Sequence, residues 1–145
     1  MSRLPSPTVR GVPVVAGALN GVAAYVTGFV ASTALYSLVG TQLLMGSLTS
    51  SLSAGSEFGF AFYGAHFVRV SDGTASLNYT MEVVKSGELF VVLVAGILVA
   101  TGHDLAGRAG VPDDRRTRAA AGASVVLGYL PLAMFGGVYF TDTLM

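Results

Sequence analysis

Three long apolar stretches alternate with polar segments along the chain, at residues 12–39, 82–102 and 119–140. Between Gly11 and Ser56 no residue is charged. An α-helix rises about 1.5 Å per residue and a bilayer core is about 30 Å thick, so about 20 apolar residues suffice to cross it. The pattern therefore predicts an all-α integral membrane protein, with three transmembrane helices in a single membrane domain over residues 1–145.

Polar residues and a proline interrupt the second and third stretches. The second stretch has charges only in its first turns, at Glu82, Lys85 and Glu88. We expect these side chains at the membrane interface, where acids also suit a helix N-terminus. Pro131 lies in the middle of the third stretch and removes the hydrogen bond to the Leu127 carbonyl, which predicts a kink.

The connection over residues 41–81 has two parts of different character. Thr41 to Ser56 is rich in Ser and Thr, with leucines at roughly helical spacing, and could lie along the membrane surface. Glu57 to Val68 contains five aromatic residues and is too short to span as a helix. We expect it to be interfacial, re-entrant or packed on the helix bundle; its spacing fits both a strand and a helix.

The arginines predict the orientation, because basic residues near the ends of spans stay on the cytoplasmic side. Six of them would share one side, at Arg3, Arg10, Arg108, Arg115, Arg116 and Arg118. The connection and the start of the second span hold only Arg69 and Lys85. The N-terminus and the loop 103–118 are therefore expected in the cytoplasm, with Asp113 or Asp114 capping the third helix.

The composition excludes several classes of function. Charged residues make up 11% of the chain, against roughly 25% in soluble domains, which favours a multi-pass protein of the cell membrane. The net charge is zero, so nucleic acid is not an expected partner. There is no cysteine, the two histidines are expected on opposite sides of the membrane, and no catalytic motif occurs. We expect no metal, no cofactor and no enzymatic activity.

Small residues at spacings of four mark candidate helix interfaces. Gly17 and Gly21 form a GxxxG pair in the first stretch, and Gly28 continues the same face. Ser124 and Gly128 repeat the spacing in the third stretch. Such residues let helices approach closely in lipid. The contact could join copies of the chain in a homo-oligomer, or it could pack the helices of one chain together.

Four residues are candidates for an ion site or a gate: Glu57, His66, Glu88 and Pro131. Ionisable side chains at membrane depth are costly and often functional, and proline kinks can act as hinges. At the interface the same side chains would simply face water or headgroups. Asn78 begins the pattern Asn-Tyr-Thr, an acceptor for N-glycosylation on the expected external side.

The sequence Phe-Ala-Phe-Tyr-Gly-Ala-His-Phe-Val at residues 60–68 and Tyr-Leu-Pro at 129–131 carry a family resemblance. The chain resembles a group of uncharacterised small multi-pass membrane proteins from halophilic archaea. Gly64 stands where members of that group usually have Asn. The resemblance implies an archaeal cell membrane and a transporter-like label without a known substrate.

Taken together, these features predict a small membrane protein that acts by helix association. It would do so as a homo-oligomer or as an accessory subunit of a larger membrane complex, with the lipid bilayer as its constant partner. The alternative is a transporter or channel protomer for an ion or small solute. Three helices rarely enclose an aqueous path, so this alternative requires an oligomer.

Overall fold

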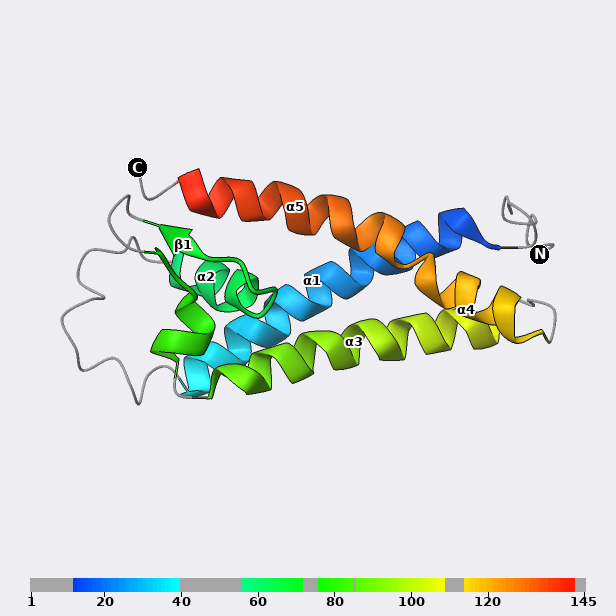
Figure 1. Ribbon diagram of the computed structural model, residues 1–145. Helices are drawn as coiled ribbons and strands as arrows, with labels where there is room; N and C mark the ends of the chain where they lie inside the picture. Colours follow the sequence, from blue (N-terminus) through cyan, green and yellow to red (C-terminus); the bar gives the residue numbers. More distant parts are fainter. Residues whose placement is uncertain (1–11, 40–55, 72–75, 85, 109–113, 143–145) are drawn as a thin grey trace. The chain divides into compact units, whose positions relative to one another are not determined.

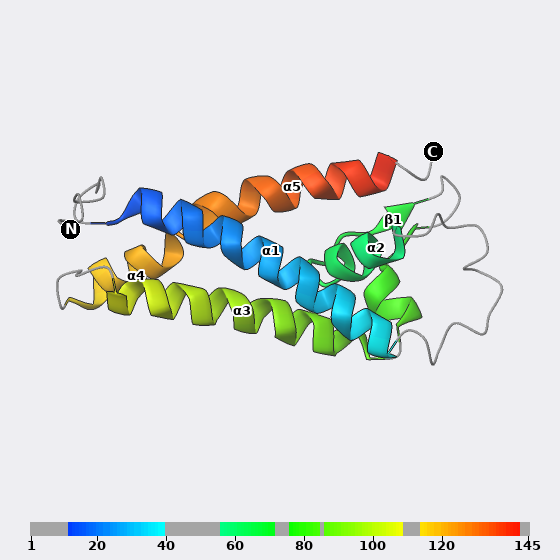
Figure 2. The same cartoon turned by 180° about the vertical axis from the view of Figure 1, so that it is seen from behind.

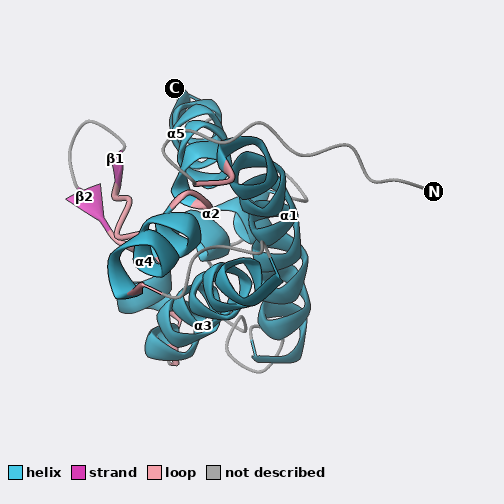
Figure 3. Ribbon diagram, turned by 90° about the vertical axis from the view of Figure 1, so that its right-hand side faces the viewer, coloured by secondary structure: helices cyan, strands magenta, loops and turns pink. Residues whose placement is uncertain are grey.

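The computed structural model describes residues 12–39, 56–71, 76–84, 86–108 and 114–142, which are mostly helical (Figure 1). The α-helices are α1 (Val14–Val39), α2 (Ser56–Gly64), α3 (Gly87–Arg108), α4 (Arg115–Ala123) and α5 (Val126–Asp142). A single turn of π-helix, η3, covers Tyr79–Val83. The strands β1 (Val70–Ser71) and β2 (Ser76–Leu77) pair antiparallel, with Val70 opposite Leu77 (Figure 3). The predicted surface segment before Ser56 lies outside the described residues.

Among the residues that the structure describes, three helices are long and apolar enough to cross a membrane: Val14–Val39, Gly87–Arg108 and Arg115–Tyr139. This agrees with the number and order of the predicted spans. The second begins five residues later than the predicted residue 82, because Tyr79–Val83 forms a separate turn. Val84 ends that turn in an extended conformation, with φ −88° and ψ 116°. Glu82 is thus not part of the second span.

The third span begins at Arg115, earlier than predicted, because Asp114 caps it. The Asp114 carboxylate accepts hydrogen bonds of 3.0 Å from the backbone N–H groups of Arg116 and Thr117. A hydrogen bond from the Thr117 side chain, together with these backbone bonds, holds the pKa of Asp114 below its ordinary value. Asp113, the other predicted cap, lies outside the described residues.

The third span is interrupted between α4 and α5, at Ser124 and Val125. The Ser124 hydroxyl donates a 2.6 Å hydrogen bond to the Ala121 carbonyl. The backbone there forms hydrogen bonds between residues three positions apart, as in a 3₁₀-helix, which is more tightly wound than an α-helix. Pro131 lies seven residues beyond Ser124, inside α5, which is assigned as helix from Val126 to Asp142. The interruption therefore arises at the serine, and a kink at Pro131 stays a prediction.

The chain divides into two compact units. The first contains residues 1–26 and 96–132, and the second contains residues 27–95 and 133–145. Helices α1, α3 and α5 each contribute residues to both units. Figures 1 and 2 show these helices from opposite sides. Different kinds of residue form the interior of each unit.

Backbone contacts between α1 and the start of α5 build the first unit. A Cβ atom at Gly17 would collide with the Ser124 side chain, and one at Gly21 would lie 3.0 Å from the Gly128 Cα. A Cβ at Gly128 would collide with the Ala18 carbonyl. Four of the predicted small residues thus pack against each other within this chain, namely Gly17, Gly21, Ser124 and Gly128, whereas Gly28 faces Phe62.

Two further contacts complete the first unit. Gly102 of α3 faces Gly122 of α4, and a Cβ added to either glycine would lie 3.1 Å from the carbonyl oxygen of the other. Tyr25 packs edge-on against Tyr129, with ring centroids 5.8 Å apart. The close approach of α3 and α4 therefore depends on glycine.

The second unit has the aromatic segment as its core, folded as α2. Six consecutive residues, Gly59 to Gly64, are buried in this short helix, which packs beside η3 (Figure 1). Phe62 is fully buried, lies 5.4 Å from Phe29 between ring centroids, and meets the face of α1 at Gly28. The structure thus favours the helical interpretation of this segment. A helix buried on all sides shows no clear periodicity, which explains the ambiguity of its sequence.

We predict that Gly21→Ala lowers the free energy of unfolding by about 1 to 3 kcal/mol, because its Cβ has no room beside the α5 backbone. Gly107→Ala is the control, since a Cβ there meets no atom within 4 Å. Unfolding of the protein in mixed detergent micelles would measure both variants. Equal stability of Gly21→Ala and the wild type would contradict the close contact.

Candidate functional site

Three polar side chains from different elements of the second unit form a short chain of hydrogen bonds. The Tyr36 hydroxyl donates to the Glu57 carboxylate over 3.3 Å and lies 2.7 Å from the Tyr79 hydroxyl. Either tyrosine hydroxyl could donate the shorter of these bonds, and the chain links Tyr79 through Tyr36 to Glu57.

Each member of this chain is held in place by its own element. Tyr36 lies near the end of α1, on the face that also carries Gly28 and Ser32. Glu57 lies in the first turn of α2, where a negative charge suits the helix dipole. Tyr79 opens η3 directly after its cap, Asn78. Residues far apart in the sequence are thereby brought to one place.

Aromatic rings pack against Tyr36 and Tyr79, and both tyrosines are buried. Phe58 packs edge-on against Tyr36 at 5.8 Å between centroids, and Phe60 lies 5.9 Å from Tyr79. Burial raises the pKa of Tyr79, and the nearby Glu57 charge raises it further, although the bond to Tyr36 acts in the opposite direction. The raised pKa keeps the Tyr79 hydroxyl protonated at neutral pH.

Asn78 and Thr80, on either side of Tyr79, fasten η3 to α2. The Thr80 hydroxyl contacts two carbonyls, those of Phe60 at 3.1 Å and Ala61 at 2.8 Å, and Thr80 is fully buried. The Asn78 amide donates to the Gly64 carbonyl at 3.0 Å, and its oxygen accepts from the Met81 N–H. These bonds fix the position of the Tyr79 hydroxyl.

The same contacts bear on the predicted glycosylation of Asn78. The side chain is only 6% exposed, and its amide nitrogen is the atom that would carry a glycan. Attachment of a glycan there would require the Asn78 side chain to leave its buried position beside the Gly64 carbonyl. The folded chain uses Asn78 as a structural cap, and its glycosylation stays a prediction.

His66, a second predicted ion-site residue, lies just after α2. Its Nδ1 is 2.8 Å from the Phe62 carbonyl oxygen, and because a carbonyl only accepts, Nδ1 carries the proton. The ring also packs against Phe62 at 4.7 Å and Tyr63 at 6.1 Å between centroids. Burial lowers the pKa of His66, and the bond to Phe62 opposes this effect. The arrangement favours a neutral imidazole.

The four candidates for an ion site or gate therefore have different surroundings. Glu57 accepts a hydrogen bond from Tyr36, which in turn is bonded to Tyr79. The His66 ring instead packs against Phe62 and Tyr63. Glu88 is exposed in the first turn of α3. Pro131 belongs to the first unit and is also exposed. Of these four, only Glu57 takes part in the chain of hydroxyl groups.

Sequence reasoning missed Tyr36 and Tyr79, as well as two hydroxyls in α1. Ser32 Oγ and Thr33 Oγ1 are buried, and within the part of the chain that the structure describes neither has a hydrogen-bond partner. Ser32 lies one helical turn before Tyr36. The available signal was the position of Tyr36, which follows Gly28 and Ser32 at intervals of four residues. Its partner, Tyr79, lies 43 positions away in the sequence.

The described residues contain no candidate metal site. Residues 12–39, 56–71, 76–84, 86–108 and 114–142 contain no group of three His, Asp or Glu side chains that could hold a metal ion. The chain of tyrosine hydroxyls can instead hold a proton donor against the Glu57 carboxylate. In an apolar surrounding such a bonded group can fix a helix contact or pass a proton.

The fold defines a helical protein with three helices of membrane-spanning length. Residues 3–144 match the sequence profile of DUF7978, a family of unknown function, and the chain belongs to this family. No curated protein matches the chain, and no solved structure does. The match covers almost the whole chain, so both units are parts of one family architecture.

We predict that Thr80→Val destabilises the protein by about 1 to 3 kcal/mol, because it leaves the Phe60 and Ala61 carbonyls without the hydroxyl donor. Thr80→Ser keeps the hydroxyl and is expected to lose much less. Thermal unfolding in detergent would compare the two variants. A larger loss for Ser than for Val would show that packing rather than hydrogen bonding dominates here.

Proposed function

We propose that this chain is an integral membrane protein that crosses the cell membrane three times. The single observation that supports this most is the apolar outer surface of its helices. Leu19 is 66% exposed, Val99 is 72% exposed and Phe135 is 78% exposed, one on each of the three long helices. Polar Ser32, meanwhile, is fully buried. Lipid is the surrounding in which such a surface is stable.

The arginines support an orientation with the N-terminus in the cytoplasm. Arg115, Arg116 and Arg118 are exposed at the start of α4, and Arg108 ends α3. Basic residues close to span ends stay on the cytoplasmic side. The resemblance to membrane proteins of halophilic archaea supports the archaeal cell membrane as the location.

We propose further that the protein acts by helix association, as a homo-oligomer or as an accessory subunit. Gly17 and Gly21 already pack within the chain, so another surface must serve a partner. Gly96 and Ala100 of α3 are both exposed and stand four residues apart, and a Cβ at Gly96 meets no atom within 4 Å. This spacing of small residues suits a second helix in lipid.

The alternative, a transporter or channel protomer, has one observation in its favour. The chain from Tyr79 to Glu57 and the unpartnered Ser32 and Thr33 hydroxyls are polar groups among apolar surroundings. They could border a path for protons or small ions in an oligomer. Flux into liposomes that disappears in Glu57→Gln would favour this alternative over association alone.

The topology can be tested directly, because the natural chain has no cysteine. With a membrane-impermeant maleimide on intact cells, we expect Val68→Cys to react and Thr117→Cys to react only after the membrane is opened. Val99→Cys, in the middle of α3, is the control and should stay unlabelled in both conditions. Labelling of Thr117→Cys in intact cells would reverse the orientation, and ready labelling of Val99→Cys would argue against insertion.

Native mass spectrometry of the protein in nanodiscs tests association. We expect a defined homo-oligomer that Gly96→Leu converts to monomer, because a large side chain separates the helices. Val138→Leu, on an exposed position of α5, is the control and should keep the oligomer. A wild-type monomer would rule out self-association and leave the accessory role.

A further inference from the structure

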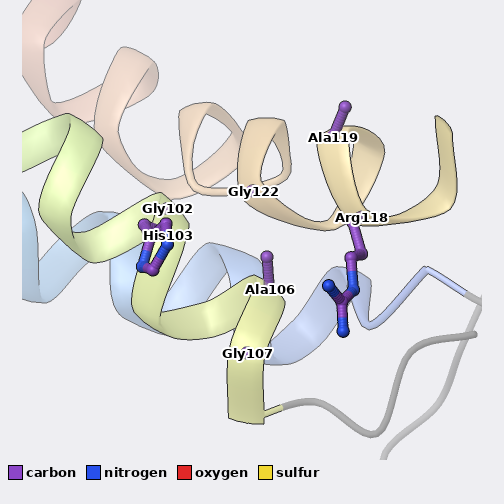
Figure 4. A pocket seen from close by; sticks show the side chains of 7 residues that line it. All are labelled: Gly102, His103, Ala106, Gly107, Arg118, Ala119 and Gly122. Atoms are coloured by element: carbon purple, nitrogen blue, oxygen red, sulfur yellow. The ribbon is translucent and has the colours of Figure 1, made fainter. Parts of the chain in front are cut away.

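A pocket opens in the first unit, where the end of α3 faces α4. Its volume is about 460 Å³. Gly102 and Gly122 form its narrow side, Ala106 and Gly107 border it along α3, and His103 and Arg118 also line it. Arg118 extends from α4 to the side on which α3 lies, and Ala106 points back toward α4 (Figure 4). Its small side chains leave the space to a ligand.

The polar groups of the pocket suit an anion. His103 and Arg118 are both exposed, and none of the described residues that line the pocket is acidic. The planar fork of Arg118 fits the oxygen atoms of a phosphate.

The apolar surroundings of the pocket distinguish a lipid from a soluble anion. Val99 lies one turn before His103 on the same face of α3 and is 72% exposed. A Cβ at Gly107 meets no atom within 4 Å, so the pocket stays open on this side. An amphiphile could place its charged end at Arg118 and its chain along Val99, whereas a free anion would leave the apolar part uncovered.

We propose that this pocket binds the phosphate headgroup of an anionic membrane lipid. Arg118 holds the phosphate together with His103, and an acyl or alkyl chain lies over Val99. Basic pockets between helices on the cytoplasmic side are suited to anionic headgroups, and the cytoplasmic leaflet supplies them. The inference rests on the membrane location and orientation proposed above.

The test is native mass spectrometry of the full chain from nanodiscs containing equal amounts of phosphatidylglycerol and phosphatidylcholine. We expect the wild type to retain phosphatidylglycerol in preference, and Arg118→Gln to reduce this preference about fivefold. Arg116→Gln is the matched control, because it removes the same charge two residues away and outside the pocket lining. If the lipid were held only by general attraction to the charged surface, the preference for phosphatidylglycerol would fall equally in both variants. That result would overturn the proposal.

A second pair of variants tests the space rather than the charge. Gly107→Leu should fill the pocket and abolish the preference, whereas Ala123→Leu, on an exposed position outside the lining, should keep it. Preference that persists in Gly107→Leu would overturn the proposal. Displacement of the lipid by inorganic phosphate would show a site for free anions instead. Failure of every variant to enter nanodiscs would contradict the membrane location itself, and so differs from failure of the pocket.

Discussion

The structure depends on one constraint: a polar group that faces away from water needs a partner inside the chain. The Thr80 hydroxyl meets two carbonyls of α2, and the Asn78 amide meets a third. In the first unit Asn20 satisfies its own amide by donating to the Ala16 carbonyl one turn earlier, at 2.8 Å. Short polar side chains thus satisfy these buried groups, whereas Ser32 Oγ and Thr33 Oγ1 have no partner in the described part of the chain.

Each unit meets a second requirement, close packing, with a different kind of residue. The first unit relies on the absence of side chains, since Gly21 and Gly128 bring two backbones together. The second relies on large rings, with Phe62 packed edge-on against both Phe29 and Tyr63. Direct contact between helix backbones in one unit, and edge-on packing of aromatic rings in the other, give close-packed interiors. The chain achieves this without tryptophan or cysteine.

The sequence predicted the features that depend on local pattern. Hydropathy over 20 residues located the three long helices, and the four-residue spacing located Gly17, Gly21 and Ser124. It did not predict the meeting of Tyr36 with Tyr79, because long-range contacts leave no periodic trace. It also missed the break at Ser124, where a hydroxyl competes for a backbone carbonyl, and it proposed a kink at Pro131 from the missing N–H alone.

The contact between Gly64 and Thr80 ties together two positions that are distant in the sequence. A Cβ at residue 64 would occupy the space of the Thr80 side chain, which also holds α2 and η3 together. A protein of this architecture that carries Asn at position 64 needs a displaced turn as well as a smaller residue at position 80, because the added Cβ would also lie 2.8 Å from the Thr80 backbone nitrogen. These two sites are therefore expected to change together during evolution, and each limits the substitutions that the other can accept.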